Sequence, residues 1–121
     1  MAQDLKQLEI WKESIAFHKI LISEITKFPK EEFYARGSQL RRAPLSISNN
    51  LAEGCGRQTI NDFKNFLHIS MGSVKEVESM LIIARDLGYL TQMTFDDLNE
   101  KINTIGRKLN VFTQKAAGGN S

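Results

Sequence analysis

The sequence has few of the residues that build covalent or metal-bound cores. Its single cysteine, Cys55, excludes a disulfide within the chain, and with only His18 and His68 beside it the ligands for a structural zinc site are too few. No apolar run approaches the roughly 20 residues that a membrane span requires. The first residues also lack the basic start and apolar block of a signal peptide. These absences predict a cytoplasmic protein with no metal, no cofactor and no membrane association.

The sequence also lacks an excess of charge of either sign, since the formal net charge is only +2 over 121 residues. A nucleic-acid-binding domain more often has a strong basic excess on one face. The basic residues are unevenly distributed along the sequence. The segment 101–121 carries four basic and no acidic residues, and Glu53 is the single acid within a second basic cluster: Arg36, Arg41, Arg42 and Arg57. The length suits one globular domain with a sizeable core.

Strand-like alternation is not sustained anywhere, whereas apolar residues recur at three- and four-residue steps. The pattern predicts an all-α antiparallel up-down four-helix bundle, with helices at about 6–28, 37–54, 59–88 and 94–115 and a frayed tail at 116–121. The expected core positions form one seam on each helix. They are Leu8, Trp11, Ile15, His18, Ile22 and Ile25; Leu40, Ala43, Ile47 and Leu51; Phe63, Leu67, Ser70, Val74, Val77, Leu81 and Ala84; and Leu98, Ile102, Ile105, Leu109 and Phe112.

Helix ends are marked by proline, glycine and capping residues. Phe28-Pro29 should end the first helix, and Gly54-Cys55-Gly56 should end the second. Two further helix starts have the spacing of an N-cap with an acid three residues on: Thr59 with Asp62, and Thr94 with Asp97. Gly88 should close the third helix.

Pro44 lies inside the second helical pattern, where proline would cost roughly 3 kcal/mol in a regular helix. Either the helix kinks there, or it starts near Ala43 after a separate turn. The apolar stripe runs through from Leu40 to Leu51. We therefore expect a kink.

A polar stripe lies beside the apolar one on this second helix: Gln39, Arg42, Ser46, Asn49 and Glu53. A surface that only faces water draws more on Lys and Glu, whereas Arg, Ser, Asn and Gln make directed hydrogen bonds. Three interpretations stay open: a solvated face, a subunit interface, or a surface that contacts RNA phosphates through Arg41, Arg42 and Arg57. Phe33, Tyr34 and Tyr89 could stack on bases, although aromatic rings at helix ends more often cap the core.

Catalytic motifs are missing, because no nucleophile has a base at a recognisable spacing. His18 lies on a seam and is expected to be a hydrogen-bonded structural histidine, and His68 is expected at the surface. Cys55 is expected to be a small residue at a helix end. The segment 54–57 lacks the lysine and longer glycine pattern of a phosphate loop. We therefore expect no enzymatic activity.

Several short motifs, in order from about Leu8 to Leu90, resemble the bacterial family of 23S rRNA intervening-sequence proteins. They are Trp11-Lys12, Phe28-Pro29-Lys30-Glu31-Glu32, Gln39-Leu40-Arg41-Arg42-Ala43, Ser46-Ile47, Asn50-Leu51-Ala52-Glu53-Gly54, Gly56-Arg57, Phe66-Leu67 and Gly72-Ser73. Members often carry proline directly after the Ser-Ile pair, where this chain has Ser48. The family is similar in fold to accessory proteins of diversity-generating retroelements, which assemble as pentameric barrels and bind nucleic acid with a reverse transcriptase.

The resemblance implies a four-helix subunit of a ring-like homopentamer. We expect a non-enzymatic oligomer that binds RNA or a ribonucleoprotein; the alternatives are a protein interaction scaffold without nucleic acid, or a small-ligand site for which the sequence supplies no recognisable chemistry. The residues expected to contact RNA or a neighbouring subunit are Gln39, Arg41, Arg42, Ser46, Asn49, Asn50, Glu53 and Arg57. A possible basic patch consists of Lys101, Arg107, Lys108 and Lys115.

Overall fold

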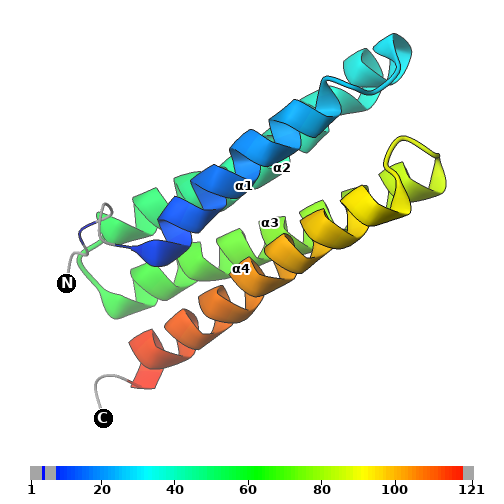
Figure 1. Cartoon of the computed structure of the whole chain (residues 1–121). Helices are drawn as coiled ribbons and strands as arrows, with labels where there is room; N and C mark the ends of the chain where they lie inside the picture. Colours follow the sequence, from blue (N-terminus) through cyan, green and yellow to red (C-terminus); the bar gives the residue numbers. More distant parts are fainter. Residues whose placement is uncertain (1–3, 5–7, 119–121) are drawn as a thin grey trace.

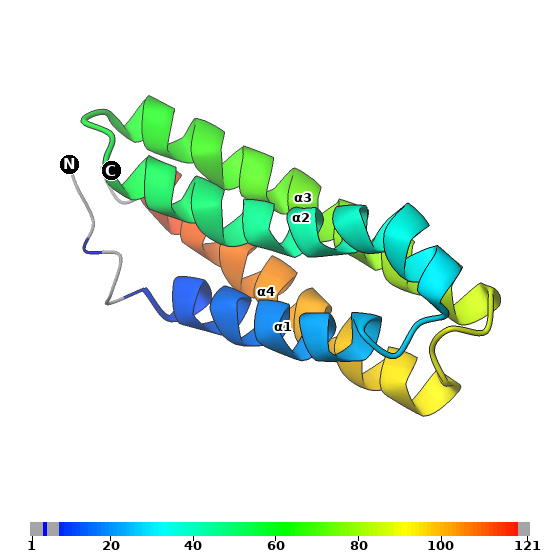
Figure 2. The same ribbon diagram turned by 90° about the horizontal axis from the view of Figure 1, so that it is seen from above.

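The computed structural model describes residue 4 and residues 8–118. This part of the chain holds four helices and no strand: α1 (Glu9–Ile25), α2 (Lys30–Cys55), α3 (Ile60–Asp86) and α4 (Gln92–Gly118). Consecutive helices run antiparallel, so the start of α1 and the end of α4 lie at the same end (Figure 1). Each helix contacts two neighbours, and within the described residues α1 does not contact α3 and α2 does not contact α4 (Figure 2). The predicted all-α four-helix fold is confirmed.

The second helix begins earlier than its apolar stripe predicts. α2 starts seven residues before position 37, with Pro29 at its N-cap and the Phe33 N–H donating to the Pro29 carbonyl at 2.9 Å. Proline is tolerated at a helix start, because the N–H it lacks would have no intrahelical acceptor there. Glu31 and Glu32 in the first turn also complement the helix dipole. These local signals outweigh the lack of apolar periodicity before Leu40.

The outer ends of the bundle differ from prediction as well. α1 ends at Ile25 rather than 28, and the Phe28 N–H donates to the Ile25 carbonyl at 3.0 Å in the turn that leads to α2. The expected start at residue 6 lies outside the described residues. α4 continues through Gly118, where a frayed tail was expected from 116, and 119–121 also lie outside the described residues.

The caps of α3 and α4 test the predicted helix starts. The Asp62 N–H donates to Thr59 Oγ1 at 3.1 Å, as expected. α4 instead starts two residues early, because the Thr94 N–H donates to Thr91 Oγ1 at 3.1 Å and Thr91 is the capping residue. The predicted Thr94 cap is therefore wrong. Gly88 follows α3 with φ of +82°, a left-handed conformation that favours glycine.

Pro44 lies within α2, and the helix is continuous on both sides of it. The pyrrolidine ring removes one backbone donor, so the Leu40 carbonyl lacks its usual intrahelical partner. Pro44 is buried, as are Leu40 and Ala43 beside it, so packing holds this stretch helical. The alternative in which the helix starts near Ala43 is wrong, and a kink at Pro44 stays a prediction.

The core follows the predicted seams on three helices. On α2 and α3 every predicted seam residue is buried, and on α4 the first four are buried while Phe112 is half-buried. The predicted seam of α1 is confirmed at its two ends, Leu8 and Ile25, and is wrong between them. The buried stripe there is Ile10, Ser14, Phe17, Leu21 and Ile25, and Trp11, Ile15, His18 and Ile22 are half-buried beside it. Ser14 occupies a core position because its Oγ donates to the Ile10 carbonyl at 2.8 Å.

The helices α2 and α3 meet through small and hydrogen-bonded residues. Ser70 Oγ of α3 donates to the Ile47 carbonyl of α2 at 3.0 Å. A Cβ placed on Gly54 would lie 3.0 Å from Cδ1 of Phe63, so glycine allows the close approach of the two helices. No helix within residue 4 and residues 8–118 is long and apolar enough to cross a membrane.

Candidate functional site

The eight side chains expected to contact RNA or a subunit, seven on α2 and Arg57 just after it, do not all face the same way. Gln39 and Ser46 lie on the side next to α3, where Gln39 lines a small pocket with residues of α3 and Ser46 is hydrogen-bonded to that helix. Gln39 is nevertheless exposed, as are Arg42, Asn49 and Glu53. Because successive helical residues turn by about 100°, Arg41 projects from a neighbouring part of the exposed surface, not from the same line as Arg42. The predicted polar stripe of α2 is therefore divided among several small surfaces.

Ser46 is hydrogen-bonded within the chain. Ser73 Oγ of α3 donates to Ser46 Oγ at 2.8 Å, and Asn50 Nδ2 donates to Ser46 Oγ at 3.0 Å and to the Ser46 carbonyl at 2.8 Å. Ser46 and Asn50 are half-buried, and polar groups in such positions are stable when hydrogen-bonded. These two residues therefore contribute to α2–α3 packing, which leaves them less hydrogen-bonding capacity for a partner.

Arg41 and Arg42 are exposed and keep their charge uncompensated. The guanidinium carbon of Arg41 lies 4.9 Å from the centre of the Phe33 ring, and Arg42 Nη2 donates to Ser38 Oγ at 3.3 Å. No carboxylate among residues 8–118 forms an ion pair with either arginine. A ring and a hydroxyl orient these two cations without neutralising them.

A hollow of about 570 Å³ near the C-terminal end of α2 brings three predicted site residues together. Asn49, Glu53 and Arg57 line it, with two small residues between them. Arg57 Nη2 lies 3.2 Å from Glu53 Oε2, and its guanidinium carbon lies 4.6 Å from the centre of the Phe66 ring. Glu53 thus reduces the positive charge of Arg57, while Phe66 fixes the plane of the guanidinium.

The aromatic rings considered for base stacking have different surroundings. Tyr34 is 71% exposed, and its ring centre lies 5.6 Å from that of Phe33, edge-on. Phe33 is half-buried and carries Arg41. Tyr89 packs against Phe28, with ring centres 5.5 Å apart, at the end of the core. Tyr34 is therefore the ring among these three with an open face.

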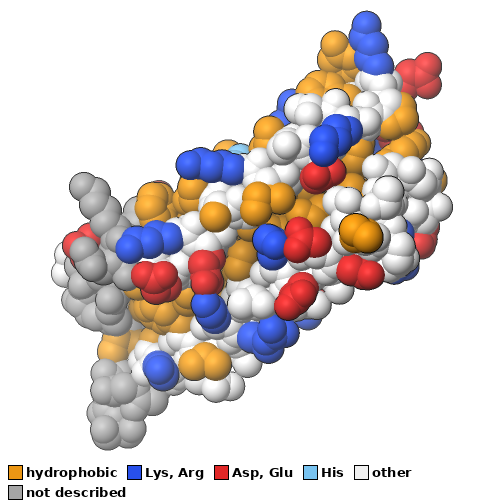
Figure 3. All heavy atoms as spheres, in the orientation of Figure 1, with side chains coloured by type: hydrophobic (Ala, Val, Ile, Leu, Met, Phe, Trp, Pro, Cys, Tyr) orange, Lys and Arg blue, Asp and Glu red, His pale blue; other side chains and the backbone are white. Residues whose placement is uncertain are grey.

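The basic residues of α4 do not form one patch: Lys101, Arg107, Lys108 and Lys115. Lys101 pairs with Asp97 at 2.7 Å, and Lys108 pairs with Glu13 of α1. Arg107 lies on the other side, in a groove of about 380 Å³ between α3 and α4. Figure 3 shows acidic and basic side chains interspersed over the face that α1 and α4 form. Because α4 is diagonal to α2 in the bundle, the two predicted basic clusters are separate surfaces.

The residues considered for catalysis or metal binding lie apart. Cys55 is buried, and burial, with a smaller contribution from the charge of Asp4, raises the pKa of its thiol. His68 is exposed, as expected. Nδ1 of His18 is covered and has no hydrogen-bond partner in the described part of the chain, so the expected hydrogen-bonded histidine is a wrong prediction. Burial lowers the pKa of His18.

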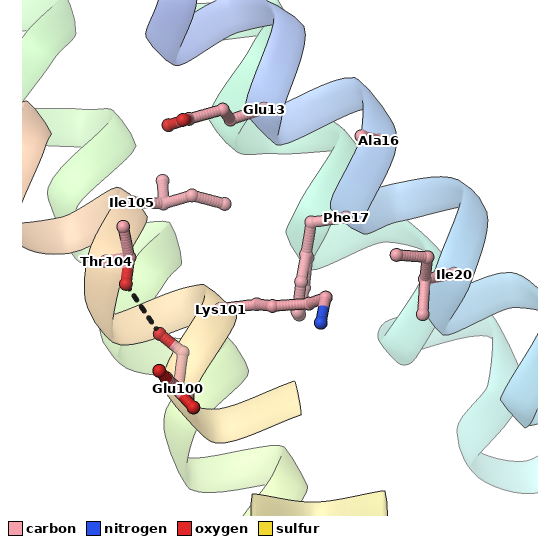
Figure 4. A pocket seen from close by; sticks show the side chains of 8 residues that line it. All are labelled: Glu13, Ala16, Phe17, Ile20, Glu100, Lys101, Thr104 and Ile105. Atoms are coloured by element: carbon pink, nitrogen blue, oxygen red, sulfur yellow. Dashed lines mark hydrogen bonds between the residues drawn. The ribbon is translucent and has the colours of Figure 1, made fainter. Parts of the chain in front are cut away.

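One residue that the sequence reasoning missed is Glu13. Its Oε1 accepts from Lys108, whereas Oε2 is covered and lacks a partner among the described residues. Glu13 lies in a cleft of about 330 Å³ between α1 and α4 (Figure 4). Nothing in the spacing of α1 distinguishes Glu13 from the glutamates that face water.

The chain matches the family model described as 23S rRNA-intervening sequence protein over residues 6–111. It is also similar to the crystal structure of a protein with unknown function from the S23 ribosomal protein family of Bacteroides thetaiotaomicron. The TM-score is 0.75 at 20% identity, over 87% of this chain and 95% of that chain, so this likeness concerns the fold alone. A search of curated proteins gives no match. Because the family model spans all but the ends of the sequence, the chain belongs to the 23S rRNA-intervening sequence protein family.

Proposed function

We propose that this protein is a cytoplasmic, non-enzymatic homo-oligomer that binds structured RNA or a ribonucleoprotein through the exposed side of α2. The observation that carries the proposal is the pair Arg41 and Arg42, which are adjacent, exposed and without a carboxylate partner in residues 8–118. An uncompensated guanidinium can donate paired hydrogen bonds to a phosphate. Membership of a family named for an rRNA insertion is consistent with this partner.

The length of α2 suits a polyanion better than a single small anion. The last residue of α2, Cys55, follows Arg42 by 13 residues, which corresponds to about 20 Å along a helix, and Arg57 lies just beyond this end. Asn49 lies between Arg42 and Arg57, so hydrogen-bond donors and acceptors are available along the whole exposed side. On α4, Lys101 and Lys108 are paired with acids, so Arg107 and Lys115 are the residues of that helix available to contact phosphates.

The second candidate function is a protein interaction scaffold that binds no nucleic acid. It is favoured by aliphatic side chains left exposed on α2 and α3: Leu45 at 39%, Ile69 at 49% and Ile83 at 43%. Gly72, between the last two, has no atom within 4 Å of where a Cβ would lie, so a neighbouring helix could approach closely there. The same residues could hold the ring-like homopentamer that the family resemblance implies, with or without RNA.

The test is the salt dependence of RNA binding, measured by fluorescence anisotropy with labelled fragments of bacterial 23S rRNA. Replacing Arg41 and Arg42 together by Gln should weaken binding and lower the slope of log Kd against log salt by about 1.4 to 1.8, the value for two lost phosphate contacts. The matched control is Lys12→Gln with Lys19→Gln, which removes the same charge from the exposed side of α1 and should leave most of the affinity.

Light scattering after size-exclusion chromatography separates the two candidate functions. RNA binding predicts that the Arg41→Gln, Arg42→Gln variant keeps the oligomeric state of the wild type and loses affinity. The scaffold predicts that the wild type takes up no RNA at low salt, and that the same variant dissociates. Equal loss of affinity in the α1 control would assign binding to overall charge and overturn the role of α2.

A further inference from the structure

The cleft between α1 and α4 has an apolar floor and a charged rim. Phe17, Ile20 and Ile105 supply the large apolar side chains of its lining, and Ile20 is 37% exposed. Figure 4 shows Glu13 reaching from α1 towards α4 at one end of the cleft, and Lys101 reaching from α4 towards α1 at the other. The volume of about 330 Å³ is in the range of small-ligand sites.

The charges around this cleft leave an excess of carboxylate. Lys101 Nζ is held by Asp97 at 2.7 Å, and Lys108 is held by Glu13 Oε1. Glu100 lines the cleft, and its carboxylate forms no ion pair within residues 8–118. Both lysines are therefore already engaged, whereas two carboxylates can still accept a donor.

Part of this uncompensated negative charge is located at Oε2 of Glu13. The oxygen is covered, and it has no hydrogen-bond donor in the part of the chain that the structure describes. A buried oxygen of an ionised carboxylate without a donor carries a large desolvation cost, which a charged donor would remove. Glu13 lines the cleft, and the last torsion of a glutamate has a broad preference, so rotation about this torsion can present Oε2 to a ligand in the cleft.

We propose that the α1–α4 cleft binds a small organic cation, namely a primary ammonium group on a compact apolar body. The ammonium donates to Glu13 Oε2, and the body lies against Phe17, Ile20 and Ile105. An ammonium suits the Glu13 end because it carries the opposite charge and has three donors, one of which can serve Oε2. The inference uses none of the α2 side chains proposed to contact RNA, so the two proposals stand or fall separately.

Three probes that share one apolar body test the preference for a cation: 4-phenylbutylamine, 4-phenylbutanol and 4-phenylbutyrate. Each is titrated into the full-length protein carrying ¹³C-labelled isoleucine methyl groups. The amine should shift the methyl resonances of Ile20 and Ile105 saturably, and those of Ile69 and Ile83 on α3 should not move. We expect the alcohol to bind at least tenfold more weakly than the amine, and the butyrate more weakly still. Equal affinities, or shifts that miss Ile20 and Ile105, would overturn the proposal.

Two variants then test where in the cleft the amine binds. Glu13→Gln keeps the shape of the side chain and should remove the advantage of the amine over the alcohol, whereas the matched Glu100→Gln should change it less than threefold. Ala16→Leu fills the cleft from an exposed position without touching Glu13, and it should block all three probes. Amine binding that survives Glu13→Gln or Ala16→Leu in a folded variant would place the amine elsewhere.

Discussion

The two helix pairs α2–α3 and α1–α4 are built in opposite ways. Between α2 and α3, small residues and hydroxyl groups let the helices approach, and the Ser46–Ser73 and Ser70–Ile47 hydrogen bonds cross from one helix to the other. Between α1 and α4 the contact is the least extensive of the four, a cleft remains open, and one ion pair crosses it. Hydrogen bonds and small residues thus bring the first pair into close contact, whereas in the second pair an ion pair crosses beside an open cleft.

The uncompensated polar atoms follow the same division. The covered side-chain atoms without a hydrogen-bond partner in the described residues are Glu13 Oε2 and His18 Nδ1, and both belong to α1. Native proteins leave few such atoms, and each invites an explanation. We therefore expect α1 to be the helix whose packing responds most readily to ligands and to pH.

The largest contrast is expected between core and cleft truncations. Ile47→Ala removes a fully buried α2 side chain whose backbone carbonyl also accepts from Ser70. It should lower the free energy of unfolding by about 2 to 5 kcal/mol. Ile20→Ala in the cleft removes a partly exposed side chain and should cost less than about 1 kcal/mol. Urea denaturation of the two variants measures both values. Similar costs would mean that the α1–α4 contact is as tightly packed as the α2–α3 contact.

Sequence patterns predicted the buried residues of the closely packed pair α2–α3 better than those of α1 in the pair α1–α4. On α2 and α3 the apolar seam is uninterrupted or carries a serine at a seven-residue position, and every seam residue that the periodicity predicts is buried. The periodicity misses only small residues and Pro44, which are buried beside the seams: Gly37, Pro44, Ser48, Gly54 and Cys55 on α2, and Ser73 on α3. On α1 the buried Ser14 breaks the apolar series, and Trp11, Ile15 and Ile22 form a second series on a flank of the helix. A hydroxyl that bonds to its own backbone is buried at little cost, and no pattern of hydrophobicity records that bond.

Glycine substitutions test the close approach of α2 and α3 directly. A Cβ on Gly54 would lie 3.0 Å from Phe63 Cδ1 and 3.1 Å from Phe66 Cβ, so Gly54→Ala should cost about 1 to 3 kcal/mol through displaced rings. The matched change is Gly72→Ala on the open side of α3. It meets nothing within 4 Å and should stabilise the monomer by up to about 1 kcal/mol, because alanine favours the helix. Thermal unfolding shows whether each substitution lowers or raises the stability of the protein. A stabilising Gly54→Ala would show that the contact has room to spare.

The candidate site was predicted in part for the same reason. The exposure of Arg41, Arg42 and Asn49 follows from their distance around the helix from the apolar stripe. That Ser46 accepts a hydrogen bond from Ser73 as well as from Asn50 depends on how α3 is placed against α2, which single-helix periodicity does not contain. Likewise, the free oxygen of Glu13 arises only where α1 and α4 meet, so only the tertiary structure could identify it.

The smallest expected effect concerns His18 and the pH dependence of stability. Burial lowers the pKa of His18 in the folded state below its ordinary value of 6.5, so the unfolded chain binds the proton more readily. The stability associated with His18 is then fully present above pH 6.5 and is lost as the pH falls through the folded-state pKa. His18→Leu should flatten the fall in unfolding free energy between pH 7 and pH 5, measured by urea denaturation, while His68→Gln on the exposed side of α3 should leave that fall as in the wild type. If His18→Leu keeps the full pH dependence, protonation of His18 costs no stability in the folded state. The packing around His18 would then be loose enough to hydrate the charged imidazole.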